Sequence, residues 1–268
     1  MRPNGRYLRN NLILMLTAVF LMGCSGLISK ISQKTPEEDD LLAITGAQEV
    51  LSRLKTQNQG LKSIKGIGKL KLWLKGELKI DERIAWIGAD PTQLSIVVLI
   101  SGYPAIKIAN DGKWFYYYEA NQDQSIYKKI RATDASLERL LSIKINPSDI
   151  IALLKGRVPL REHDSAFLLQ DNITGGYVLT LKKKWRGVTE KVFLNEEKSQ
   201  VSLMEFFNRS GSTNYRAQFE EMQNISGYQV PSRLHLFNNE GSTIQLDIQK
   251  YWTDVPVSPE MFVLKPPD

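Results

Sequence analysis

The most regular hydrophobic pattern in the chain lies between Ile64 and Leu74, where apolar residues alternate with basic ones. The even-numbered positions are apolar or glycine, while the odd-numbered positions include Lys65 and Lys69. Because successive side chains of a strand point to opposite faces of a sheet, this pattern predicts a strand with one apolar face and one lysine-bearing face. We interpret these lysines, and the later basic run 182–185, as solvated. Attraction of acidic partners or lipid headgroups is the alternative.

Shorter runs of apolar residues follow along the whole chain, separated by turn-forming residues. The predicted strands cover residues 64–74, 78–87, 94–100, 105–109, 114–119, 125–130, 166–170, 177–185, 188–194, 201–208, 215–220, 233–237 and 244–250. Asn110, Asp111 and Gly112 form a typical hairpin turn between two of these runs. Connections this short join antiparallel neighbours.

Three stretches have a helical pattern instead. They are residues 41–55, residues 136–142 and a segment that begins after the cap residue Asn146 and ends at Gly156. No linker interrupts residues 41–268, so the pattern predicts one mainly β (α+β) domain. A single antiparallel sheet of this length must twist and curl toward a barrel, with the helices over its concave face.

The first 23 residues have the composition of a secretory signal peptide. Three arginines precede an apolar run that ends before Gly23 and Cys24, the only cysteine in the chain. The run of about 11 residues is shorter than the roughly 20 that a membrane-spanning helix needs. Residues 21–24 resemble the lipobox of bacterial lipoproteins, so we expect Cys24 to be lipidated. The alternative is an ordinary signal peptide, or a signal anchor, that contains a cysteine.

Cleavage before Cys24 would leave a mature chain of modest charge. The full chain carries a net charge of +6, of which three positive charges belong to arginines of the signal peptide. The remainder does not indicate nucleic acid, and we expect no such partner. Residues 24–40 lack apolar periodicity and are predicted to form a flexible tether. Lipidation of Cys24 leaves no thiol for a disulfide, so packing alone must hold the domain 41–268 together.

The sequence contains few residues that are typical of catalysis. Its two histidines are His163, in a polar segment, and His235, on the polar side of a predicted strand, whereas a metal site needs several ligands. No serine-hydrolase elbow, zinc-protease helix or phosphate loop is present. Gly66 and Gly68 lie inside a predicted strand, so we interpret them as residues that let the sheet bend. We therefore expect no enzymatic activity, no cofactor and no metal ion.

The inward apolar faces of the predicted strands have two interpretations. A filled core is the ordinary one. A curved sheet that only a few helices cover can instead leave part of its concave face open, and large β cups of this kind hold apolar ligands. The candidate cavity-lining residues are Leu70, Leu72, Leu74, Ile84, Trp86, Leu94, Ile96, Val98, Ile150, Leu153 and Leu154.

The order of these features resembles the LolA/LolB superfamily of lipoprotein carriers, and most of all its outer-membrane branch, LolB. The matching features are the lipobox, the first helix, the strand with two glycines, and the stretches 84–86, 102–104, 110–112 and 149–157. The resemblance implies an incomplete antiparallel barrel with a helical lid over an apolar cavity. The cavity would hold the acyl chains of a passenger lipoprotein.

The resemblance also implies where the protein acts. It predicts a lipid anchor in the bacterial outer membrane, facing the periplasm, and a loop formed by Gly102, Tyr103 and Pro104 that helps to deliver the passenger. Tyr103 would project from the rim or, alternatively, fold back on the sheet edge. The expected partners are acyl chains of lipoproteins or lipids, the membrane and a periplasmic carrier protein, with the chain itself a monomer. The alternative function is a tethered envelope scaffold with a filled core.

Overall fold

The computed structural model describes residues 36–89, 91–120, 125–132, 138 and 141–266, with side chains from residue 43 onward. Residues Asp40–Asp268 form one compact unit. The predicted signal peptide and most of the predicted tether lie outside the described residues, as does most of the predicted helix 136–142.

One antiparallel sheet of thirteen strands makes up most of the described chain, as the sequence predicts. The strands are β1 (Ser63–Leu74), β2 (Glu77–Ala89), β3 (Gln93–Ile100), β4 (Tyr103–Asn110), β5 (Trp114–Glu119), β6 (Ile126–Arg131), β7 (Ser165–Gln170), β8 (Tyr177–Lys183), β9 (Gly187–Leu194), β10 (Val201–Phe207), β11 (Thr213–Ile225), β12 (Tyr228–Phe237) and β13 (Thr243–Thr253). Their order is β6-β5-β4-β3-β2-β1-β13-β12-β11-β10-β9-β8-β7. The first strand therefore pairs with the last in the middle of the sheet. Because β6 and β7 form its two edges, the sheet is not closed into a barrel.

The last three strands are longer than the sequence predicts. β11 and β12 extend toward each other and meet at a tight turn, where Ser226 and Gly227 have φ angles of 53° and 88°. Pro231 lies within β12, opposite Met222 at an irregularity in the pairing with β11. Proline is tolerated in a strand at such an irregularity, although it is atypical of a regular central strand.

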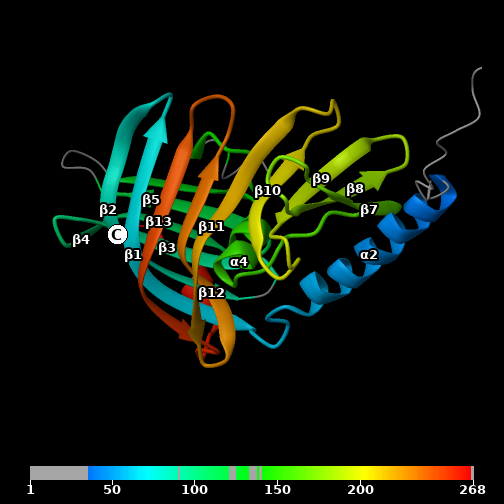
Figure 1. Ribbon diagram of the computed structural model, residues 1–268. Coiled ribbons are helices and arrows are strands. Elements are labelled where there is room, and N and C mark those ends of the chain that lie inside the picture. Colours follow the sequence, from blue (N-terminus) through cyan, green and yellow to red (C-terminus); the bar gives the residue numbers. More distant parts are fainter. Residues whose placement is uncertain (1–35, 90, 121–124, 133–137, 139–140, 267–268) are drawn as a thin grey trace, which may run out of the picture. The chain divides into compact units, whose positions relative to one another are not determined.

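The longer helix, α2 (Pro36–Thr56), begins five residues before the predicted start at residue 41. Proline is favoured in a first helical turn, and the acidic residues 37–40 suit the positive end of the helix dipole. The shorter helix, α4 (Pro147–Leu154), contacts β3 and β12 and lies within the curve of the sheet (Figure 1). Among the described residues, no helix has both the length and the apolar character needed to cross a membrane.

The two glycines of β1 serve close packing rather than a simple bend. A Cβ atom at Gly66 would lie 2.0 Å from Cζ2 of Trp86, so the glycine leaves room for the indole ring. A Cβ atom at Gly68 would lie 2.4 Å from the carbonyl oxygen of Asp247, at the bulge between β1 and β13. Both positions exclude larger residues for steric reasons.

The C-terminal segment covers part of the outer face of the sheet. The 3-10 helix η1 (Pro259–Phe262) contacts β3, and Phe262 is fully buried. Val97 of β3 and Met261 line a shallow outer groove beside Pro256. This cover explains why β3 carries apolar residues on both faces.

Candidate functional site

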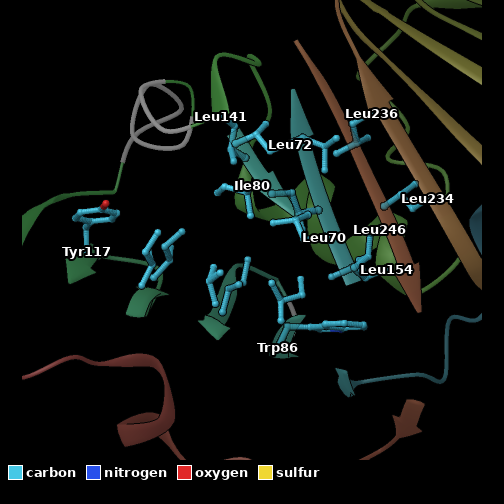
Figure 2. Close-up of a pocket in the computed structure, with 17 residues that line it drawn as sticks. Leu70, Leu72, Ile80, Trp86, Tyr117, Leu141, Leu154, Leu234, Leu236 and Leu246 are labelled. Carbon is cyan, nitrogen blue, oxygen red and sulfur yellow. The ribbon is translucent and has the colours of Figure 1, made fainter. Parts of the chain in front are cut away.

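An apolar cavity of about 180 Å³ lies on the concave face of the sheet. It is enclosed by β1 to β5, β12, β13 and α4, and Figure 2 shows Tyr117 and Leu234 at opposite ends of it. The lining residues are Leu70, Leu72, Ile80, Ile84, Trp86, Ile96, Val98, Ile106, Ile108, Tyr117, Leu141, Ile150, Leu154, Leu234, Leu236, Ile244 and Leu246.

The cavity presents almost no polar chemistry. Of the described residues that line it, Trp86 and Tyr117 alone have a side-chain nitrogen or oxygen atom. The Tyr117 hydroxyl donates a hydrogen bond to Glu119 at 2.7 Å, and burial together with this bond raises the pKa of Tyr117. Trp86 Nε1 is buried and has no hydrogen-bond partner within the described part of the chain. Because none of the described lining side chains is charged, the cavity suits an apolar ligand.

Most of the residues predicted to line a cavity do line this one. They are Leu70, Leu72, Ile84, Trp86, Ile96, Val98, Ile150 and Leu154. Whether they contact an acyl chain stays a prediction.

Three of the predicted residues lie elsewhere. Leu74 is half-buried beside the turn that follows β1. Leu94 pairs with Gly88, next to Ile151 of α4, and is buried under that helix. Leu153 is fully buried on a different side of α4 from the cavity-facing residues.

Sequence reasoning missed about half of the lining. The missed residues are Ile80, Ile106, Ile108, Tyr117, Leu141, Leu234, Leu236, Ile244 and Leu246. Those on β4, β12 and β13 do alternate with polar residues, so their inward orientation is visible in the sequence. Their place in the cavity depends on the pairing of β1 with β13, which no local pattern encodes.

A buried polar network holds the N-terminal end of α4. Asp149, 3% exposed, accepts hydrogen bonds from both terminal nitrogens of Arg161, at 2.9 and 2.6 Å. The Tyr215 hydroxyl donates to the same carboxylate at 2.8 Å, and burial and Asp149 together raise the pKa of Tyr215. The Arg161 guanidinium also lies 4.7 Å from the ring centre of Phe206. The sequence marked Asp149 only as a helix-start residue, and the other members of the network were missed.

Glu190 adds a second buried carboxyl to this network. Its Oε2 accepts the backbone N–H of Arg161 at 2.8 Å, while its Oε1 has no partner among the described residues. Burial raises the pKa of Glu190 to about 8, although the Arg161 N–H and charge oppose the shift. Near neutral pH this carboxyl is therefore mostly protonated.

Hydrogen bonds also hold the C-terminal end of α4. Tyr251 donates to the Leu154 carbonyl at 2.9 Å, and the buried Lys155 ammonium donates to the Lys62 carbonyl at 2.7 Å. Arg157 donates to the carbonyl of Leu61, also at 2.7 Å. Hydrogen bonds therefore connect both ends of α4 to neighbouring elements, and its middle lines the cavity.

The sheet beyond β12 has a filled core instead. Ala47, Val50, Leu51 and Leu54 of α2 are buried in this core. A Cβ atom at Gly46 would lie only 3.2 Å from Leu168 of β7, so the helix lies directly on that strand. The strands β7 to β11 contribute Leu168, Leu179, Leu181, Val192, Met204, Phe206 and Ala217.

Comparison with solved structures identifies the architecture. A LolA superfamily protein from Nitrosomonas europaea has a TM-score of 0.54 and 17% identity, covering 81% of this chain and 97% of that one. A DUF1329 family protein from Desulfovibrio piger has a TM-score of 0.53 and 12% identity, covering 82% and 97%. A putative outer membrane lipoprotein-sorting protein domain from Vibrio parahaemolyticus has a TM-score of 0.52 and 12% identity, covering 81% and 97%.

The fold of this chain is LolA-like. At these identities the likeness shows the fold alone. No protein-family model matches the sequence, and no curated protein matches it.

Tyr103 does not lie in the loop that the sequence predicts for this LolA-like chain. The turn between β3 and β4 consists of Ser101 and Gly102 alone, with φ angles of 51° and 85°, and Tyr103 pairs with Ile100 as the first residue of β4. Serine seldom adopts a positive φ, so the sequence did not indicate a two-residue turn at Ser101 and Gly102. The predicted loop was therefore wrong. Tyr103 is nevertheless 77% exposed, so it projects from the end of the hairpin. Cys24 lies outside the described residues.

Proposed function

We propose that this protein is a lipid-anchored carrier of the bacterial envelope. It takes the acyl chains of lipoproteins, or of another lipid cargo, into its cavity and helps to insert them into the outer membrane, as LolB does. The observation that carries the proposal is the apolar cavity on the concave face, where no described lining residue has a charged side chain. A dry aliphatic cavity is an unfavourable surface for water and a favourable one for hydrocarbon.

The cavity volume bears on how much cargo fits. An aliphatic cavity of about 150 Å³ binds benzene, and sites for larger ligands start at about 300 Å³. At about 180 Å³, this cavity accommodates only part of an acyl chain. Because α4 is held at both ends, we expect the cavity to widen on the opposite side, where Ile106 and Tyr117 lie on β4 and β5.

Titration with a fluorescent fatty acid tests the proposed binding. Val98→Phe places a ring in the cavity and should abolish saturable binding. Val97→Phe makes the same change on the opposite face of β3, where Val97 lines the outer groove, and should leave binding intact. Equal binding by both variants would contradict the cavity as the site.

The anchor has a separate test. Cys24→Ala should abolish incorporation of a radioactive fatty acid in bacteria, since the chain contains no other cysteine to form the thioether. Continued labelling of the Cys24→Ala chain would exclude the proposed lipoprotein anchor.

A tethered envelope scaffold is the second candidate function. The small volume of the cavity and the filled core beside it favour this reading. It predicts that the native chain shows no saturable fatty-acid binding in the same titration.

A further inference from the structure

The turn between β8 and β9 exposes a tryptophan in an unusual backbone position. Trp185 is 94% exposed, and its φ angle is 66°. The Arg186 N–H donates to the Lys183 carbonyl at 3.0 Å, which places Trp185 at the third position of a β-turn. Glycine or asparagine is usual at a turn position with positive φ, so a bulky aromatic there is strained and gains no burial in return.

Basic side chains surround this turn. Lys184 lies 5.9 Å from the centre of the Trp185 ring. A groove of about 340 Å³ between the β8–β9 and β10–β11 turns is lined by Arg186, Lys191 and Arg209, with no acidic side chain among its described lining residues.

The nearby carboxylates are already engaged. Glu162 forms an ion pair with Lys183, and Asp164 accepts the backbone N–H of Lys184 at 2.5 Å. In a larger polar cleft next to the groove, Lys144 is paired with Glu138 and Arg161 with Asp149, while Glu162 is paired with Lys183. Arg186 and Arg209 are the other basic residues of its described lining. The net charge of this surface is therefore positive, which suits an anionic partner.

The β8–β9 turn lies at the same end of the strands as Tyr103. In a sheet of consecutive antiparallel hairpins, every second turn lies at the same end of the strands. The β10–β11, β12–β13, β1–β2 and β3–β4 turns lie at the same end of the strands as the β8–β9 turn. The Gly76 N–H of the β1–β2 turn donates to the Gly241 carbonyl of the β12–β13 turn at 3.1 Å. Figure 1 shows the tips of β1–β2 and β10–β11 on the same side of the sheet.

We propose that the β8–β9 turn is a membrane-docking element that inserts Trp185 among the headgroups of an anionic bilayer. Arg186, Lys191 and Arg209 then bind the lipid phosphates. Tryptophan is favoured at the membrane–water interface, and basic side chains near it are attracted to anionic lipid. This inference concerns the orientation of the protein on a membrane and does not depend on the proposed cargo.

The test uses the intact chain incorporated in phosphatidylglycerol vesicles whose acyl chains carry bromine, a quencher of tryptophan fluorescence. The lipid anchor proposed on Cys24 would keep every variant at the vesicle, so differences in quenching report contact of a tryptophan with lipid. The native chain should be quenched, and Trp185→Phe should lose most of that quenching. Trp252→Phe, which removes another exposed tryptophan, should keep it. Circular dichroism checks that each variant stays folded.

Two further arms define the chemistry. Arg186→Gln combined with Arg209→Gln, or phosphatidylcholine in place of phosphatidylglycerol, should reduce the quenching several-fold, as should added salt. Val98→Phe should be quenched like the native chain, which separates docking from cargo binding. Equal quenching of the native and Trp185→Phe chains would overturn the proposal, and the basic turn would then suit an acidic protein surface instead.

Discussion

The two parts of the concave face use the same alternating strands but differ in what covers them. On β7 to β11, the apolar face of α2 lies on the sheet, and side chains such as Leu179 and Val192 are completely buried. On β1 to β5, β12 and β13, the short helix α4 contributes Ile150 and Leu154, and a cavity remains. A long helix fills one part and a short one leaves the other open, so strand patterning alone does not decide between core and cavity.

The difference has an energetic meaning. Side chains that border an empty space lose dispersion contacts that a filled core would supply. Leu70, Ile96 and Ile106 face inward and are nevertheless only partly buried. The cavity therefore stabilises the fold less than the same residues would in a filled core.

The largest expected effect comes from breaking the polar network at the boundary between the two parts. Arg161→Ala leaves the Asp149 carboxylate buried without its cation and should cost about 3–5 kcal/mol of unfolding free energy. Lys69→Ala removes an exposed ion pair with Asp81 and should cost less than about 1 kcal/mol. Urea denaturation measures both, and equal losses would show that the network does not hold α4.

A larger side chain should change the unfolding free energy differently in the two parts of the concave face. Val192→Phe overpacks the filled core and should cost about 1–3 kcal/mol. Val98→Phe enters the cavity and should be neutral or stabilise by up to about 2 kcal/mol. Similar destabilisation of both variants in urea would contradict the distinction between filled and open parts.

Glu190 gives the filled part a dependence on pH. Its pKa is raised from the ordinary 4.5 to about 8, so between these values the folded chain holds a proton that the unfolded chain has lost. Stability should therefore fall as pH rises through this window. Glu190→Gln should remove this pH-dependent loss of stability. The melting temperature of the Glu190→Gln chain minus that of the native chain should therefore be larger at pH 8 than at pH 5. The exposed Glu240→Gln should show no such difference, and a Glu190→Gln effect equal at both pH values would refute the assignment.

The smallest effect on stability is expected at the exposed hairpin end. Tyr103→Glu should change unfolding free energy by less than about 0.5 kcal/mol and leave fatty-acid binding intact. It should slow the transfer of a bound lipoprotein to liposomes, because a charged side chain is disfavoured at the membrane interface. Normal transfer would remove Tyr103 from the mechanism.

The sequence allowed most strands to be predicted because alternation is a local property. It also placed most of the inward residues of β1 to β3 in the cavity lining. On α4 it found Ile150 and Leu154 but wrongly added Leu153. It could not reveal that β13 pairs with β1, so Leu246 was missed while its partner Leu70 was found. The contacts of Arg161 and Tyr215 with Asp149 join residues far apart in the chain, and nothing in their local sequence marks them. Long-range pairing, rather than strand formation, set the limit of prediction.

Native mass spectrometry of the chain purified from a bacterial envelope tests the central claim most directly. The account predicts a bound, acyl-bearing mass that is absent from the Val98→Phe chain and present with Val97→Phe. Under denaturing conditions this mass should dissociate, while the covalent lipid that we propose on Cys24 should remain. A native chain that carries no dissociable lipid, or one that binds it equally in the Val98→Phe variant, would contradict a cavity that holds acyl chains.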